Sequence, residues 1–196
     1  KLSKLDMTTK FDSVRANLSA GQIRRIVGTV DGTMDINIGV GGEVLGANVV
    51  LDLKNGSLLL EDFAQSVSVN QASLKMALRK GDLTVDSFAA DFTEGGAIKL
   101  SGKMFVASDW TPRNFSMSLD ADNLDARFFQ ALWPQWAMAK TRRWMQTNLL
   151  AGHLENARIS MVGSFEPGSQ KPVLSDLSGT GSYKNTTVKW ASNMPL

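Results

Sequence analysis

The sequence predicts a mainly β fold, in which a long twisted antiparallel meander forms a groove and two helices lie near residues 125–151. Three observations predict it. Apolar and polar residues alternate over most of the chain, as in Val49, Leu51 and Leu53, and this period of two is typical of half-buried strands. Glycine-containing turns separate these runs. The period changes only within 125–152, a segment that holds three of the five tryptophans.

The alternating runs predict strands in order along the chain, with tight turns between them. Asn55-Gly56 is a strong turn dipeptide, and further turns are expected at Gly41-Gly42, at 80–82 and at Gly95-Gly96. Residues 166–176 are rich in polar residues, proline and glycine and predict a loop. The strands are expected within 34–40, 48–54, 57–61, 66–70, 73–78, 83–85, 88–92, 98–106, 115–121, 157–161, 177–183 and 187–190.

The helical segment divides at Pro134, because proline cannot continue a helix but fits its first turn. We expect a short helix near 125–132, with Asp122 or Asn123 as its N-cap, and a longer helix near 135–151 that Gly152 ends. One side of the longer helix is expected to carry Ala137, Met138, Thr141, Trp144, Met145 and Leu149, and the other side Trp136, Lys140, Arg143 and Thr147.

The domain organisation follows from these patterns. Residues 1–124 are expected to form a β-meander that makes the groove, 125–152 a helical insertion, and 153–196 the continuing strands. The abrupt ends at Lys1 and Leu196 predict a piece of a longer protein, so that any export signal or membrane anchor would lie outside this sequence and its absence here excludes neither. The absence of cysteine excludes disulfides and thiolate metal sites. It is compatible with any compartment, the periplasm included.

The composition offers little for catalysis. The single histidine, His153, is expected beside a helix end, where a structural role is the usual one. Asp82, Asp86 and Asp91 are scattered and match no metal-binding loop, and the paired glycines lack phosphate-binding spacing. We therefore expect no catalytic residues, metal or cofactor. A net charge of +2 and a single tyrosine do not favour nucleic-acid binding.

The apolar side of the strands has two interpretations. It is either a covered core or an open groove that suits acyl chains, because each buried methylene contributes about 0.8 kcal/mol. The patterns alone leave both open. The candidate lipid-binding residues are Leu58, Leu60, Leu74, Met76, Leu78, Leu83, Val85, Leu100, Met104, Met117 and Leu119.

The tryptophan-rich basic segment also has two interpretations. Trp136, Lys140 and Arg143 are candidates for contact with a membrane surface or a partner, because tryptophan and basic side chains suit lipid headgroups. The alternative is a helix packed across the sheet with its basic residues in solvent. The positions of Trp144 and the methionines fit a core stripe and favour this packing.

Several motifs around the helical segment resemble the AsmA-like superfamily, and its YhdP-type branch most closely. They are Leu132-Trp133-Pro134, 140–145 (KTRRWM) and 152–157 (GHLENA), followed by a strand that ends at Gly163. The stretches 177–181, 186–190 and Met194-Pro195 are similar to the next strand pair of that family. The upstream strand repeats from residue 48 onwards share its character less specifically.

The resemblance implies a bridge-like periplasmic lipid-transfer protein of a Gram-negative bacterium, anchored in the inner membrane. Its twisted sheet would carry phospholipid acyl chains along a hydrophobic groove towards the outer membrane, with other envelope proteins as possible partners. No catalytic residue is carried over. Two other readings remain: a non-catalytic structural or scaffold β-domain for envelope assembly, which would lack an open groove, and a hydrolase of envelope glycans, which would need converging carboxylates.

Overall fold

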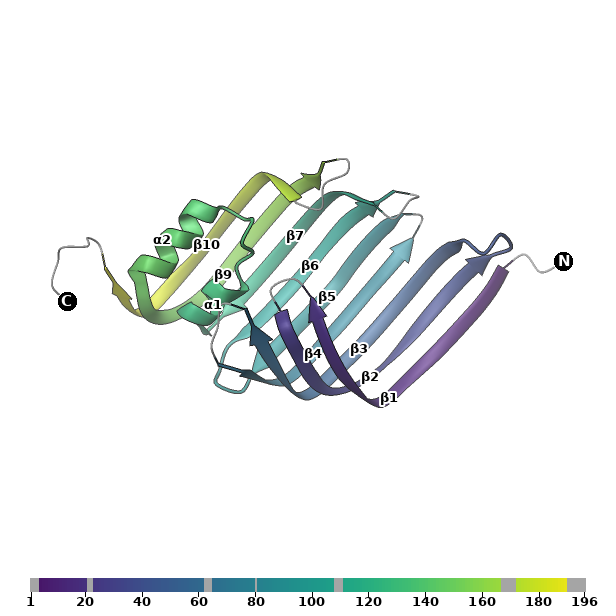
Figure 1. The fold of residues 1–196 in the computed structure, drawn as a ribbon, viewed down its shortest axis with the longest axis horizontal. Coiled ribbons are helices and arrows are strands. Elements are labelled where there is room, and N and C mark those ends of the chain that lie inside the picture. The colour runs from purple at the N-terminus through teal and green to yellow at the C-terminus, as the bar shows by residue number, and fades with distance from the viewer. Residues whose placement is uncertain are drawn as a thin grey trace.

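The computed structural model describes residues 4–20, 23–61, 65–79, 81–107, 111–166 and 172–189. Within these ranges the chain forms one ten-stranded antiparallel sheet and two helices (Figure 1). The sheet has the order β1-β2-β3-β4-β5-β6-β7-β9-β10, and the short strand β8 pairs with β9. Nearly every strand therefore lies beside its neighbour in sequence, as the alternating pattern predicts for a meander. The predicted fold class is confirmed.

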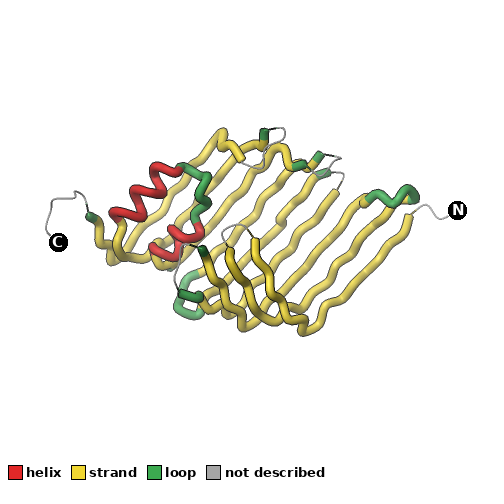
Figure 2. The backbone as a smooth tube through the Cα atoms, viewed as in Figure 1, coloured by secondary structure: helices red, strands yellow, loops and turns green. Residues whose placement is uncertain are grey.

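The strands are longer than the sequence runs that predict them. Their bounds are β1 Lys4–Ala20, β2 Ile23–Gly39, β3 Val44–Leu60, β4 Val67–Arg79, β5 Asp82–Phe92, β6 Ala97–Val106, β7 Pro112–Asp122, β8 Leu124–Asp125, β9 Leu149–Phe165 and β10 Pro172–Val188. The helices α1 (Ala126–Leu132) and α2 (Ala139–Asn148) connect β8 to β9, and both lie on the same side of the sheet (Figure 2).

The strand register places most of the apolar residues of β2–β7, β9 and β10 on one face. Residues that oppose each other in neighbouring strands point to the same side, so each row across the sheet can be followed from strand to strand. One row runs through Met34, Val49, Met76, Val85, Gly102, Met117, Met161 and Leu177. The next runs through Gly32, Leu51, Leu74, Phe88, Leu100, Leu119, Ile159 and Gly179.

The opposite face of the sheet is polar. One of its rows consists of Ser101, Ser118, Ser160 and Ser178. Another contains an exposed ion pair in which Arg158 Nε lies 2.7 Å from Asp120 Oδ1. Exposed pairs of this kind contribute little to stability, but they keep this face in water. The two faces of the sheet therefore differ sharply in polarity.

The ends of β1, β2 and β3 curl back over the apolar face (Figures 1 and 2). The bend in β3 lies at Asn55-Gly56, where Asn55 has a φ of 49° and the register with β2 shifts between Val27 and Thr29. Such an irregularity bends a strand and increases its twist. The prediction of a tight turn at Asn55-Gly56 is therefore wrong, because this dipeptide bends a continuous strand.

Two other predicted boundaries also make the strands shorter than they are in the structure. The runs 66–70 and 73–78 belong to the single strand β4, and a register shift against β5 between Val69 and Gln71 separates them. The expected loop 166–176 is shorter, because β10 already begins at Pro172. Pairing with β9 extends β10 through polar residues whose local pattern favours a loop.

The N-cap of α1 is Asp125, not Asp122 or Asn123. Its Oδ1 accepts hydrogen bonds from the backbone nitrogens of Arg127, at 2.8 Å, and Phe128, at 3.1 Å. Asp122 instead ends β7, and its side chain accepts a hydrogen bond from the backbone nitrogen of Asn156.

The longer helix is also shorter than predicted. It begins at Ala139, after an irregular segment that contains Pro134, and it ends at Asn148. Gly152 therefore does not end the helix; it lies within β9, with a φ of 132°.

The main core lies where α1 meets the sheet. Leu124, Phe128 and Phe129 pack with Leu60 and Phe92 in one buried cluster. The rings of Phe92 and Phe128 meet edge to face, with their centroids 4.8 Å apart, which is a favourable arrangement for aromatic pairs. This core occupies only one end of the apolar face.

Candidate functional site

The central apolar face of the sheet contains nine of the eleven candidate lipid-binding residues. All nine are half-buried side chains that lie in neighbouring rows of the register. Met76 faces Val85 across β4 and β5, and Leu119 reaches the edge of the buried core. The nine residues are Leu74, Met76, Leu78, Leu83, Val85, Leu100, Met104, Met117 and Leu119; we call them the groove floor.

Leu58 and Leu60 lie apart from the groove floor. Both belong to the curled end of β3 and to the core beneath α1, where they are 8% and 1% exposed. A side chain that is 1% exposed has no surface left for a ligand. The structure therefore places these two candidates in the buried core beneath α1 and not on the groove floor.

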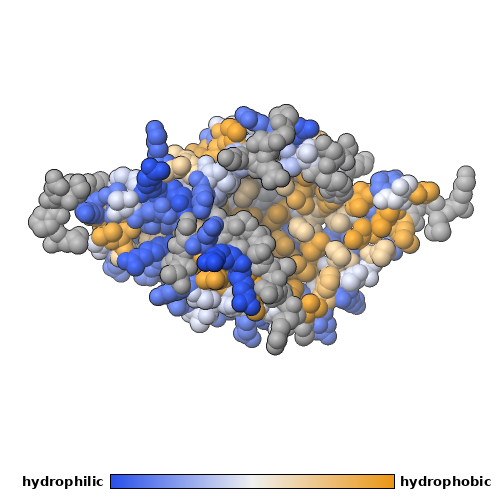
Figure 3. Space-filling view, viewed as in Figure 1, coloured by the Kyte–Doolittle hydropathy of each residue, from blue (hydrophilic) through white to orange (hydrophobic). Residues whose placement is uncertain are grey.

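The helices cover only the C-terminal part of the apolar face. Both helices make their main contacts to the sheet with β9, and Figure 3 shows hydrophobic surface gathered in the hollow beside them. The exposed hydrophobic residues in the described ranges include Leu5 and Met7 of β1. The apolar face of the open sheet is therefore covered by helices at one end.

Two hydrogen bonds fix the segment between the helices. Trp133 Nε1 donates to Ala137 O at 2.7 Å, and Arg142 Nε donates to Trp133 O at 3.1 Å. At the far end of α2, the backbone nitrogen of Lys189 donates to Asn148 O at 2.8 Å. The first two bonds tie the connecting segment to α2, and the third ties the end of α2 to the residue that follows β10.

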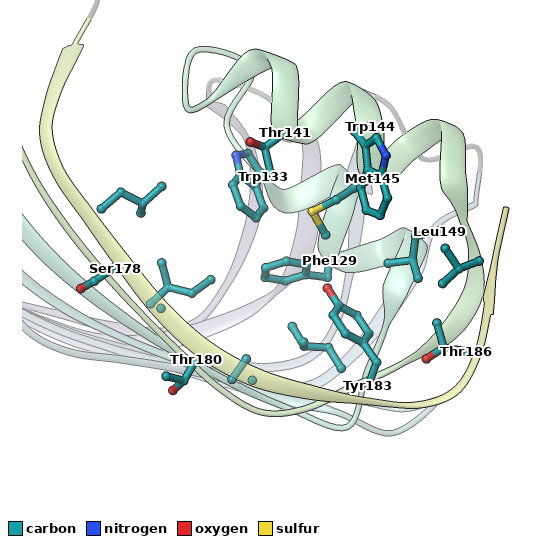
Figure 4. A pocket seen from close by; sticks show the side chains of 17 residues that line it. Phe129, Trp133, Thr141, Trp144, Met145, Leu149, Ser178, Thr180, Tyr183 and Thr186 are labelled. Atoms are coloured by element: carbon teal, nitrogen blue, oxygen red, sulfur yellow. The ribbon is translucent and has the colours of Figure 1, made fainter. Parts of the chain in front are cut away.

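A cavity of about 520 Å³ lies between α2 and the last two strands. Its walls are mainly apolar and aromatic, with Trp133, Trp144 and Met145 on the helical side. Figure 4 shows Met145 pointing from α2, and Tyr183 from β10, into the same space. Burial raises the pKa of the Tyr183 phenol above its ordinary value of 10.0, so that the phenol is neutral near pH 7.

The three candidate contact residues have different positions. Trp136 lies before α2 rather than on it; it is 42% exposed and packs edge to face on Phe115, with ring centroids 6.2 Å apart. Lys140 and Arg143 are exposed on α2. Trp136 therefore does not share a helical side with these two basic residues.

The described residues contain no group of three or more histidine, cysteine, aspartate or glutamate side chains that could hold a metal ion. His153 lies within β9 rather than at a helix end, and it lines a polar depression with Asp125 and Arg127. Asp125 caps α1 there, and Arg127 Nε donates to Leu150 O at 2.9 Å. Both side chains therefore have structural partners.

Sequence reasoning did not assign the cavity under α2. Its lining includes Phe129, Trp133, Met145, Leu177 and Tyr183. A signal was present, because Leu177, Gly179, Gly181 and Tyr183 alternate along one face of β10. Which helix covers that face depends on packing between segments more than 30 residues apart, and periodicity carries no such information.

Fold and site together define a class: an open antiparallel β-meander with one apolar and one polar face, partly roofed by two helices. Comparisons of the chain with protein-family models, curated proteins and solved structures found no match. In the described part of the chain, neither helix has the length and apolar character needed to span a bilayer.

Proposed function

We propose that this chain is a segment of an AsmA-like envelope protein, which carries phospholipid between the inner and outer membranes on the apolar face of its sheet. The observation that carries the proposal is the continuity of that face. The two rows given above cross eight of the nine long strands, from β2 to β10, without a charged residue. A soluble domain rarely leaves so long an apolar face uncovered unless something binds there.

The proposed mechanism is passive. Acyl chains lie along the groove floor, where each methylene that leaves water contributes about 0.8 kcal/mol, and the headgroups stay in solvent. Because successive rows are similar, an acyl chain that moves along the groove floor exchanges one set of apolar contacts for a similar set. No chemical step and no cofactor is involved.

We propose a periplasmic location for this protein, with attachment to the inner membrane. Its ligands are phospholipid acyl chains, and other envelope proteins are its possible partners. The motifs around Trp133-Pro134 and 140–145, which resemble the AsmA-like superfamily, support this location.

The alternative function is a non-catalytic scaffold. One observation favours it: within the described residues, β1 and β10 are edge strands, each paired on one side only. A free strand edge offers backbone groups to a partner strand. A scaffold would use these edges, whereas a lipid carrier would use the apolar face, and this difference makes the two functions separable.

A pair of charge substitutions at adjacent positions tests the lipid function. Met76→Asp places a carboxylate on the groove floor, and Ala77→Asp places one on the polar face, beside Asn48 and Thr84. We would purify both variants and the unaltered protein from a Gram-negative host, and identify bound lipid by native mass spectrometry and lipid extraction.

We expect the unaltered protein and Ala77→Asp to retain phospholipid, and Met76→Asp to lose it while keeping a β-type circular dichroism spectrum. A sealed core would instead respond to Met76→Asp by unfolding, at a cost of roughly several kcal/mol. Phospholipid that is absent from the folded unaltered protein, or retained equally by both variants, would contradict the proposal.

A further inference from the structure

We infer that the cavity between α2 and β10 is a separate binding site for one straight acyl chain, whose polar head remains in solvent beside Trp144. The volume of about 520 Å³ lies within the range of roughly 300–1,000 Å³ that is usual for sites of small organic ligands. The inference stands independently of phospholipid transport along the groove floor.

The lining selects an apolar ligand. Phe129, Met145 and Leu154 contribute apolar side chains from three different elements. Thr141, Thr186 and the neutral phenol of Tyr183 are the main polar side chains that Figure 4 shows near this space. No aspartate, glutamate, lysine or arginine is among the described residues that line the cavity, so a charged group has no partner inside it.

Two glycines keep the cavity open on the sheet side. Gly179 and Gly181 alternate on β10 between Leu177 and Tyr183, and neither has a positive φ. A Cβ at Gly179 would meet its nearest atom, Arg158 O, at 3.2 Å and Ile159 Cγ1 at 3.4 Å. Backbone conformation therefore does not require glycine at 179, and the missing side chain leaves volume in the cavity.

The mouth of the cavity suits an anionic amphiphile. Trp144 lines the cavity and yet is 48% exposed, so it lies at the boundary between cavity and solvent. Lys140 precedes it by four residues on α2 and therefore lies on the same side of the helix. A fatty acid, or one acyl chain of an anionic phospholipid, would bury its tail against Met145 and present its charge to Lys140.

Tryptophan quenching locates the ligand. Bromine quenches only tryptophans that it approaches closely, so 2-bromododecanoic acid, which carries its bromine beside the carboxyl group, should quench Trp144 of the unaltered protein, whereas dodecanoic acid should bind without quenching. Trp144→Phe should retain the affinity for the bromo acid but show a smaller quench. An anionic phosphatidylglycerol with brominated acyl chains forms the second arm. A quench by the free acid alone identifies a fatty-acid site, and a quench by both identifies a site for acyl chains of either source.

Gly179→Leu should fill the cavity from the sheet side. We expect it to weaken binding of the bromo acid about tenfold or more, because each displaced methylene changes affinity about fourfold. Ser160→Leu is the matched control, because Ser160 opposes Ser118 and Ser178 on the polar face and does not line the cavity, and it should leave the affinity within about twofold. If Gly179→Leu does not fold, Thr141→Phe fills the same cavity from α2.

The inference is overturned if the bromo acid does not quench the unaltered protein, if a folded cavity-filling variant binds it normally, or if Trp144→Phe keeps the full quench. Met76→Asp separates the two proposals, because Met76 does not line this cavity. That variant should lose co-purifying phospholipid and still bind the bromo acid. If the unaltered protein retains phospholipid but the bromo acid does not quench it, the cavity inference is contradicted and the proposed phospholipid function is not.

Discussion

At the scale of single residues, the shape of the apolar face depends on where small and large side chains oppose each other. Gly163 of β9 opposes Phe115 of β7, and a Cβ at Gly163 would lie 2.6 Å from both Phe115 Cζ and Val173 O. The Phe115 ring therefore occupies the space that a side chain at 163 would need. This close approach also seats Phe115 beneath Trp136.

Gly163→Ala should destabilise the protein by about 1–3 kcal/mol, because overpacking forces the ring or the backbone of β10 to move. The free energy of unfolding, measured by urea denaturation, checks this. Gly179→Ala is the control, because its Cβ would meet its nearest atom, Arg158 O, at 3.2 Å rather than 2.6 Å, and it should therefore cost clearly less than Gly163→Ala. Equal effects of the two substitutions would contradict the steric explanation.

The Tyr183 phenol provides a pH-dependent readout of the cavity, because the chain contains one tyrosine. Burial raises the pKa of this phenol in the folded state, whereas an unfolded tyrosine titrates near pH 10. The protonated phenol therefore contributes stability that is present below about pH 10 and is lost as the pH rises through the folded value.

Phenolate absorbance should thus show a midpoint above 10.0 in the folded protein and near 10 in urea. Tyr183→Phe should remove this contribution, so that the free energy of unfolding falls less steeply above about pH 10. Coincident midpoints in the folded and urea-unfolded protein would show that the phenol is not buried.

At the scale of elements, α1 is only seven residues long, and so short a helix depends on its cap and on packing. Asp125 supplies the cap, and buried Gln130 donates from Nε2 to Leu149 O at 3.3 Å, which ties α1 to β9. The cap also fixes where β8 ends and the helical roof begins.

Asp125→Ala should cost about 1 kcal/mol, because two backbone N–H groups at the start of α1 lose their acceptor. Asp125→Asn keeps a side-chain oxygen there and should cost much less. Urea denaturation of the two variants measures the difference. An alanine variant as stable as the asparagine variant would show that the cap contributes nothing.

Two segments form strands although their local sequence favours a turn, because pairing with a neighbouring strand outweighs the local preference. Asn55-Gly56 and the polar run that starts at Pro172 have the composition of turns, yet both lie in continuous strands. In β3, Leu53 Cδ2 would lie 2.5 Å from a Cβ at Gly56. The dipeptide therefore allows β3 to bend over Leu53, a use of glycine that composition cannot distinguish from a turn.

At the scale of the whole molecule, the free energy of local opening is expected to differ between the edge of the meander and its core. Each long strand pairs with its neighbours in the sheet, and within the described residues β1 pairs with β2 alone. By contrast, β4, β5, β7 and β9 all contribute residues to the core beneath α1. In such a nearest-neighbour arrangement, parts of a structure can open without global unfolding.

Hydrogen exchange should therefore be faster for backbone amides in β1 and β2 than for those in β5 and β7, because the edge can open while the core remains folded. Native-state exchange followed by peptide mass spectrometry measures this order. Equal protection in all four strands would indicate one cooperative unit instead.

The sequence predicts those parts of the candidate site that depend on the alternation of apolar and polar residues along a strand. The positions of Leu74, Met76 and Met117 on one face follow from the period of two, since successive side chains point to opposite sides. The position of Leu58 in the core did not follow, because the bend at Asn55-Gly56 carries it away from the floor and under α1.

The sequence by itself determined the class of fold, the order of the strands and the polarity of their two faces, because each follows from contacts between residues close in the chain. Only the tertiary structure decided how β3 curls, which strands α1 and α2 cover, and that a cavity remains over Gly179. These features depend on packing between segments distant in sequence, and a local pattern of apolar and polar residues is compatible with several such packings.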